Sequence, residues 1–161
     1  DEGYWTKKGV FFVKPGSYRI RGLTLEGFST AHDHVGGRRF GYGTFWQWNQ
    51  GGLRFAHLGG TAAPLTAADK ILLGRPDVLI IAVGGGAKVY DGVEASQVVK
   101  ELNPKSVIPV QYVSGIPPSN CDQTGVQTFL DAMKGTQVNK VGKILNIRNT
   151  ISDETIIKLM H

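Results

Sequence analysis

Cysteine is almost absent from this sequence of 161 residues, which contains only Cys121. A single thiol forms no disulfide within the chain and excludes a cysteine-based zinc site, and it leaves the redox compartment undetermined. Long apolar runs are also absent, because none approaches the roughly 18 residues that a membrane-spanning helix requires. The sequence therefore predicts no membrane span, and its first residues, Asp-Glu-Gly-Tyr-Trp, do not resemble a signal peptide.

Several well-known catalytic and nucleotide-binding motifs are missing as well. Gly84-Gly85-Gly86-Ala87-Lys88 is rich in glycine, but Val89 stands where a P-loop requires Ser or Thr, and the dinucleotide fingerprint is not completed. We interpret this segment as a chain reversal after a buried strand. No Gly-x-Ser-x-Gly motif occurs, and Cys121 has no base nearby in the sequence, so the sequence does not support covalent catalysis.

The charge of the chain is mildly basic, with 18 Lys and Arg against 13 Asp and Glu. Nucleic-acid binding is therefore one alternative, and Lys7-Lys8 and Arg38-Arg39 are its best local candidates. Aromatic residues that could stack on bases follow the second pair, namely Tyr42, Phe45, Trp46 and Trp48. Because these aromatics alternate along an expected strand, core packing is the simpler explanation.

The order of the expected elements indicates a layered α/β or α+β domain over residues 1–161. The first third is β-rich, with a hairpin turn at Asn49-Gln50-Gly51-Gly52, and strands alternate with helices after Pro64. The expected strands are Val10–Val13, Tyr18–Ile20, Leu23–Phe28, Thr44–Trp48, Leu53–Leu58, Asp77–Val83 and Ser106–Val110, with two or three more from Val138 to Ile157. The expected helices are Thr66–Leu73, Asp91–Leu102 and Gln123–Met133.

The densest polar cluster is His32-Asp33-His34, which follows an expected strand and precedes Gly36-Gly37. Imidazole nitrogens bind zinc, and a neighbouring carboxylate can ligate or orient them. If the strand continues through the cluster, His32 and His34 share a face and Asp33 points away. The alternative is a pair of structural or surface histidines. His57 has apolar neighbours and is expected to be a hydrogen-bonded core residue.

An ordered series of segments resembles the metallo-β-lactamase superfamily, in particular its zinc-dependent or lactonase-like hydrolases. The series covers roughly residues 9–135, and its amino-acid sequence is especially similar to versions from photosynthetic bacteria. The resemblance implies an αββα sandwich with metals at one edge, of which this chain would be the C-terminal part, its N-terminal part missing. The series comprises Ala31-His32-Asp33-His34-Val35-Gly36-Gly37, Gly52 to Gly59, Pro64-Leu65-Thr66, Asp77 to Gly86, and Leu102 to Pro109.

The family's ligand positions are only partly filled in this sequence. The early His-x-His-x-Asp-His motif is absent, and the next family ligand, a histidine, matches His32. Gly60 replaces the aspartate that bridges two metals in the family, and Gln111 replaces the last histidine ligand. A hydrolytic zinc needs about three protein ligands. The resemblance therefore implies no cofactor, or a single weakly held zinc at His32 with His34 and Asp33 as recruits.

The leading hypothesis is a metallo-β-lactamase-like hydrolase homologue with a degenerate metal site, a pseudoenzyme that acts as a binding or assembly module. The alternatives are a weakly active metal-dependent hydrolase of a lactone, ester or phosphoester, and a basic RNA-binding domain. Since a partial sandwich exposes an apolar sheet face, we expect a homodimer or a partner segment that completes the fold. The compartment stays open between the cytoplasm and, if a signal was removed upstream, the periplasm or thylakoid lumen.

Overall fold

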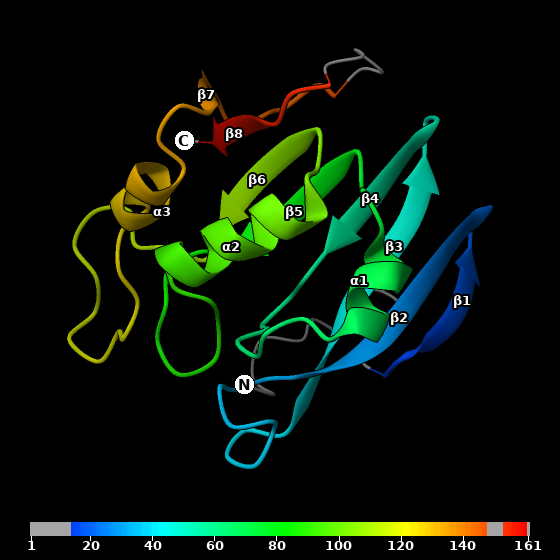
Figure 1. Ribbon diagram of the computed structural model, residues 1–161, viewed down its shortest axis with the longest axis horizontal. Helices are drawn as coiled ribbons and strands as arrows, with labels where there is room; N and C mark the ends of the chain where they lie inside the picture. Colours follow the sequence, from blue (N-terminus) through cyan, green and yellow to red (C-terminus); the bar gives the residue numbers. More distant parts are fainter. Residues whose placement is uncertain (1–13, 148–152, 161) are drawn as a thin grey trace.

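The computed structural model describes residues 14–147 and 153–160, and the expected strand Val10–Val13 lies outside these residues. One sheet of eight strands forms the centre of the domain, in the order β1-β2-β3-β4-β5-β6-β8-β7 (Figure 1). The strands are β1 (Gly16–Ile20), β2 (Leu23–Ala31), β3 (Tyr42–Gln50), β4 (Leu53–His57), β5 (Val78–Ala82), β6 (Ser106–Val110), β7 (Gln137–Val141) and β8 (Ile156–Met160).

The two halves of the sheet differ in strand direction. Strands β1 to β4 form an antiparallel meander, and β4, β5, β6, β8 and β7 pair in parallel. The expected hairpin is confirmed, although only Gly51 and Gly52 lie between β3 and β4. Strand β2 is longer than expected and extends to Ala31, because Ser29, Thr30 and Ala31 pair with the start of β3.

The helices are α1 (Ala67–Leu73), α2 (Gly92–Leu102) and α3 (Gln127–Ala132). The expected starts of the first two helices are confirmed, and Thr66 and Asp91 form capping boxes there. The prediction that the third helix begins at Gln123 is wrong. The backbone N–H of Thr124 instead donates to the carbonyl of Gly84, which holds this segment as a loop against the end of β5. None of the described helices is long and apolar enough to cross a membrane.

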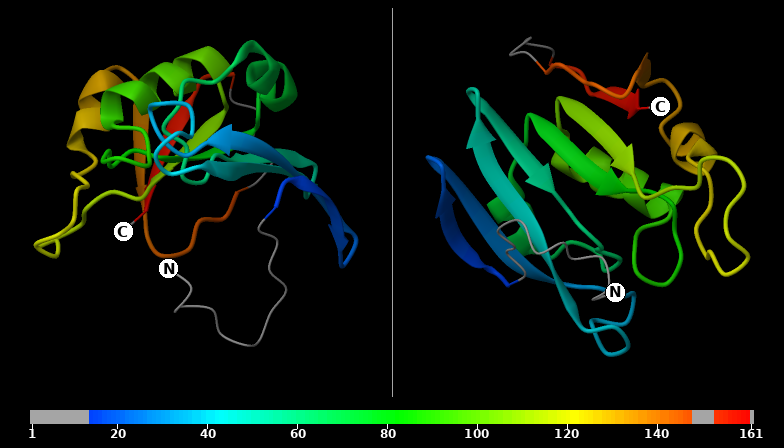
Figure 2. Two further views of the ribbon diagram at one scale, coloured as in Figure 1. Left: turned by 90° about the horizontal axis from the view of Figure 1, so that it is seen from below. Right: turned by 180° about the vertical axis from the view of Figure 1, so that it is seen from behind.

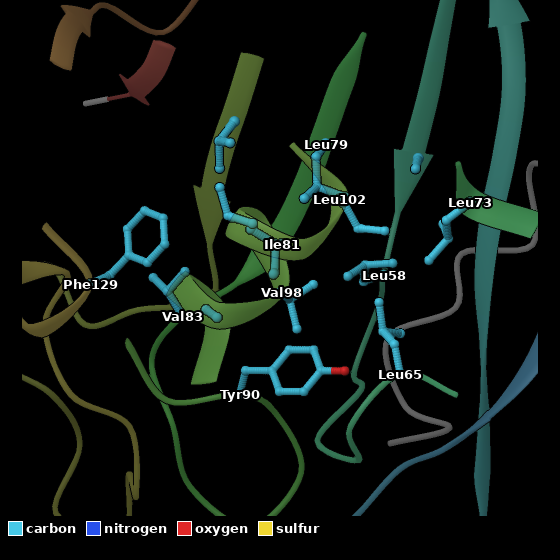
Figure 3. Packing of buried hydrophobic residues seen from close by; sticks show 14 of the residues in the cluster. Leu58, Leu65, Leu73, Leu79, Ile81, Val83, Tyr90, Val98, Leu102 and Phe129 are labelled. Atoms are coloured by element: carbon cyan, nitrogen blue, oxygen red, sulfur yellow. The ribbon is translucent and has the colours of Figure 1, made fainter. Parts of the chain in front are cut away.

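All three helices lie on the same face of the sheet, which is plain in the left view of Figure 2. The main core lies between this helix layer and the sheet, where Val98 and Leu102 of α2 face Leu79 and Ile81 of β5 (Figure 3). Phe129 of α3 is fully buried at one end of this core. The layered α/β architecture that the sequence predicts is therefore confirmed. The described residues supply one sheet and one helix layer.

Candidate functional site

Strand direction brings the candidate residues to one edge of the sheet. Strand β2 is antiparallel to β3, and β3 is antiparallel to β4, so β2 runs in the same direction as β4, β5 and β6. His32, Gly60 and Gln111 follow β2, β4 and β6 respectively, and Gly84 follows β5. All four positions therefore leave the sheet at its carboxyl edge, where ligands commonly bind in such sheets.

Asp33 organises the loop of residues 32–41. Its side chain is buried, and its two oxygens accept hydrogen bonds of 2.7–2.9 Å from the backbone N–H groups of Val35, Gly37, Arg39 and Phe40. Burial raises the pKa of Asp33, but the four donors together outweigh burial and lower the pKa to about 2. Both oxygens are thus engaged with the loop's own backbone.

His32 lies against Gly60. The Nδ1 atom of its ring forms a hydrogen bond with the Gly60 carbonyl, which makes Nδ1 the donor and leaves the lone pair on Nε2. The ring also fills the space beside the glycine, because a Cβ on Gly60 would lie 2.8 Å from Nδ1. Position 60 therefore offers no side-chain atom as a metal ligand. The His32 ring occupies the space that a side chain at position 60 would need.

His34 contacts α2, whereas His32 contacts Gly60. The strand ends at Ala31, so the alternation expected for residues 32–34 does not apply. The Nε2 atom of His34 lies 3.1 Å from Oε1 of Glu94 in an exposed pair at the start of α2. Farther along this loop, two cations lie over the ring of Phe40: Arg39 of the loop itself, 4.8 Å from the ring centre, and Lys88 of the segment after β5, at 5.0 Å. These contacts fix the loop against neighbouring segments.

Gln111 ends β6 in an unusual backbone conformation. Its φ is +49°, which few residues other than glycine adopt, and its side chain is exposed. The backbone of Gly84 approaches it closely, since a Cβ on Gly84 would collide with the Gln111 carbonyl and lie 3.0 Å from Cα of Tyr112. The β5 and β6 ends are therefore packed backbone to backbone, and the Gln111 amide is presented to solvent.

The glycine segment after β5 reverses the chain, as the sequence predicts. The Gly85 N–H donates to the Tyr90 carbonyl, and the Ala87 N–H donates to Oδ2 of Asp122 at 3.0 Å. Asp122 belongs to the long loop after β6, so its carboxylate ties the two loops together. Sequence reasoning missed Asp122 and Glu94, because each meets its partner across dozens of residues. The Asp33 contact to Val35 does have a local signal, the tendency of Asp to bond two residues ahead.

His57 lies apart from the edge cluster. It is half-buried on the face of the sheet opposite the helices, and its Nδ1 accepts the Gly59 N–H at 2.9 Å. Burial lowers the pKa of His57. A hydrogen-bonded structural histidine, as the sequence indicates, accounts for these contacts.

The donor set can be compared with the needs of a metal ion. Within residues 14–147 and 153–160, no group of three His, Cys, Asp or Glu side chains is arranged to hold a metal. His32 offers one ring nitrogen, Asp33 is occupied by backbone donors, and His34 is paired with Glu94. Ligation by these three residues stays a prediction, and their arrangement does not fit the three-ligand site of a hydrolytic zinc.

Comparisons with known proteins give a consistent result. A family model described as a β-lactamase superfamily domain matches residues 3–111. The structure is similar to a Thermotoga maritima protein named as a zinc-dependent hydrolase of the metallo-β-lactamase superfamily, with a TM-score of 0.73 and 26% identity over 92% of this chain and 71% of that one. It is also similar to the metallo-β-lactamase fold protein YhfI of Bacillus subtilis, with a TM-score of 0.59 and 11% identity over 98% and 56%.

A Parabacteroides distasonis protein named as a metal-dependent hydrolase is similar at a TM-score of 0.56 and 16% identity, over 80% of this chain and 54% of that one. This chain therefore spans between about half and about 70% of these three solved proteins. No curated protein matches the sequence. The family and fold expected from the sequence are confirmed, whereas a link to photosynthetic bacteria is not shown.

Proposed function

The chain belongs to the metallo-β-lactamase superfamily, and we propose that it is a member with a degenerate metal site that serves as a binding or assembly module. The observation that carries the proposal is the contact between His32 and Gly60. It joins the one histidine that matches a family ligand to the glycine that replaces the bridging aspartate. The chain thereby has the sheet edge at which the family binds metals, but it lacks the carboxylate that bridges two cations there.

The chemistry of the other donors supports the same proposal. The carboxylate of Asp33 accepts four backbone bonds, so a metal would have to displace those donors and open the loop. The neutral amide of Gln111 is a poor substitute for imidazole, and it lies exposed. A single imidazole is too little to hold zinc while lowering the pKa of its water, and no hydrolytic step is assigned to this edge.

Metal analysis of the purified protein tests the proposal. We expect zinc, manganese and iron to be far below one equivalent after desalting, and His32→Ala to leave these contents unchanged. His57→Ala is the matched control, because it removes an imidazole that lies away from the edge. Near-stoichiometric metal that disappears in His32→Ala but persists in His57→Ala would instead establish a metal-binding protein.

The rival function is weak metal-dependent hydrolysis of a lactone, ester or phosphoester. Chromogenic substrates of each class, assayed with zinc or manganese added in excess, distinguish it from the proposal. We expect rates equal to those of His32→Ala under the same conditions. A rate that depends on both the added metal and His32 would make the chain an enzyme.

An assembly role is supported by the sheet face opposite the helices, which none of the described helices covers. Trp46, Trp48 and Phe55 lie half-buried on this face, and Trp48 and Phe55 stack with ring centres 5.1 Å apart. A sheet with one apolar face against helices and a second apolar face requires a further layer. Either a second copy of the chain or a completing segment meets that requirement.

A further inference from the structure

A polar hollow lies beside α1 on the helix side of the sheet, away from the carboxyl edge. Its volume is about 330 Å³, and small-molecule sites commonly start at about 300 Å³. The hollow is formed near the starts of β2 and β4, at the opposite end of these strands from His32 and Gly60. Its polar side chains come from three neighbouring strands and are Thr24, Glu26, Gln47, Asn49 and Arg54.

The strand register places these side chains on one face of the sheet. Gln47 of β3 pairs with Glu26 of β2, and Asn49 of β3 pairs with Arg54 of β4. Directly paired residues share a face, as do residues two apart on one strand, such as Gln47 and Asn49. The face is the helix side, because Nε2 of Gln47 donates to the Leu72 carbonyl of α1 at 2.9 Å.

Gln47 presents an unused oxygen atom to the hollow. The residue is only 8% exposed, and no described residue donates a hydrogen bond to its Oε1. Within residues 14–147 and 153–160, no fully buried side-chain oxygen lacks a partner, so this Oε1 must open to the hollow that Gln47 lines. An acceptor of a largely buried side chain is therefore available to a ligand.

Two opposite charges at the hollow are also unused. Glu26 is exposed and belongs to none of the ion pairs among the described residues. Nη2 of Arg54 donates to the carbonyls of Leu72 and Leu73 at the end of α1, which orients the guanidinium. The Nε and Nη1 groups of Arg54 donate to no described residue. Glu26 and Arg54 thus lie at one hollow without pairing with each other.

The donors and the acceptors are separated into two rows across the strands. The acceptor row contains the Glu26 carboxylate and the free Oε1 of Gln47. The donor row lies two residues along the strands, about 7 Å away, and carries guanidinium, amide and hydroxyl groups. From β4 to β1 its members are Arg54, Asn49, Thr24 and Arg19. A ligand that is cationic at one end and anionic at the other matches this order.

We propose that the hollow binds a free amino acid, with its ammonium group at Glu26 and Oε1 of Gln47 and its carboxylate at Arg54. Hydrogen bonds between charged groups are the strong ones, and a zwitterion makes them at both rows. A carboxylic acid without the amino group leaves Glu26 unpaired, and an amine without the carboxylate leaves Arg54 unpaired. The proposal goes beyond the metal-free binding role, since the hollow lies at the opposite end of β2 and β4 from His32 and Gly60.

Nuclear magnetic resonance and calorimetry test the proposal on the purified chain. Saturation-transfer difference spectra of a millimolar mixture of the protein amino acids identify the one that binds best. Calorimetric titrations then compare that amino acid with its analogue lacking the amino group and with its analogue lacking the carboxylate. We expect the wild-type chain to bind the amino acid at least about 10-fold more tightly than either analogue, because each analogue loses a charged hydrogen bond.

Glu26→Gln assigns the preference to the hollow. The preference for the amino acid over its analogue without the amino group should fall below about 3-fold in this variant, because the charged partner of the ammonium group is gone. Glu101→Gln is the matched control, since it makes the same change at an exposed position of α2 outside the hollow. It should keep the wild-type preference.

The preference is a ratio of two affinities measured on one protein sample, so a partly folded variant does not distort it. The absence of amino-acid binding at millimolar concentration would overturn the proposal, as would a wild-type chain that binds either analogue equally well. A preference that Glu26→Gln leaves intact, or that Glu101→Gln abolishes, would place the ligand elsewhere and overturn it too. None of these measurements depends on metal content, so the amino-acid site and the metal-free function can fail separately.

Discussion

The lack of a Cβ atom at position 60 leaves room for the His32 ring. A Cβ there would lie 2.8 Å from Nδ1 of His32, so Gly60→Ala must push the ring away from the Gly60 carbonyl. We expect a loss of about 1 kcal/mol in the free energy of unfolding, the usual net value of the one hydrogen bond that the displaced ring gives up. Urea denaturation measures it. Gly142→Ala is the matched control, since no atom lies within 4 Å of its added Cβ.

A double-mutant cycle assigns the cost of Gly60→Ala to the ring. In a His32→Ala background the methyl group meets no imidazole, so the same substitution should cost less than about 0.5 kcal/mol. An undiminished cost in that background would mean that backbone conformation, and not the imidazole, makes glycine necessary at position 60.

The carboxylate of Asp33 makes a prediction about pH. Its pKa is lowered to about 2, so its contribution to stability is complete above the unfolded value of about 4 and is lost as the pH falls towards 2. At pH 6, Asp33→Asn should lower the melting temperature by several degrees, because an amide NH₂ would face backbone donors. The difference from wild type should shrink between pH 5 and pH 2. Asp131→Asn, at an exposed position of α3, is the control for the chemical change from carboxylate to amide.

Whether the role of each residue could be predicted depends on how far apart in the sequence the residue and its contact partners lie. The sequence indicated His32, Gly60 and Gln111 as equivalent edge positions through the family resemblance. It did not indicate that Asp33 would turn inward, because the alternation considered for residues 32–34 holds only in a strand, and β2 ends at Ala31. Four backbone N–H donors of the loop, and not the alternation of a strand, determine where the Asp33 side chain lies.

At the scale of elements, α2 depends on its N-cap, Asp91, the residue just before its first turn. The carboxylate of Asp91 accepts the N–H groups of Val93 and Glu94, which have no partner within the helix. We expect Asp91→Ala to cost about 1 kcal/mol in unfolding free energy. Glu101→Ala is also on α2 and removes an exposed ion pair with Lys70 of α1, and it should cost less than about 0.5 kcal/mol in the same denaturation series. Equal costs would show that the cap contributes nothing specific.

Elements with strong local signals were predicted best. The capping residues Thr66 and Asp91 and the glycines between β3 and β4 are local signals, and the structure has each of them where the sequence places a helix start or a turn. The start of α3 was predicted too early because its true limit is a contact between Thr124 and Gly84, 40 residues apart. The apolar pattern within residues 123–133 cannot predict this start, because the contact involves a residue outside that segment.

The whole molecule retains the strand arrangement that brings positions 32, 60, 84 and 111 to one edge of the sheet. Strands β2, β4, β5 and β6 run in the same direction, and the packed core, not a bound ligand, holds them in place. If only donor atoms are lacking, returning them should return a metal. We expect the double variant G60D/Q111H to retain zinc through desalting at a level at least about ten times that of wild type. Zinc coordination is worth far more than the single hydrogen bond that the His32 ring must give up.

The single variant Q111H is the control for this experiment, since it adds an imidazole but leaves position 60 without a carboxylate. Histidine tolerates the positive φ of position 111 better than most residues, so the added ring need not distort the end of β6. Zinc in G60D/Q111H but not in Q111H would locate the deficiency in the side chains. If G60D/Q111H folds and still holds no zinc, then the backbone of the edge itself, and not only its ligands, differs from that of a metal site.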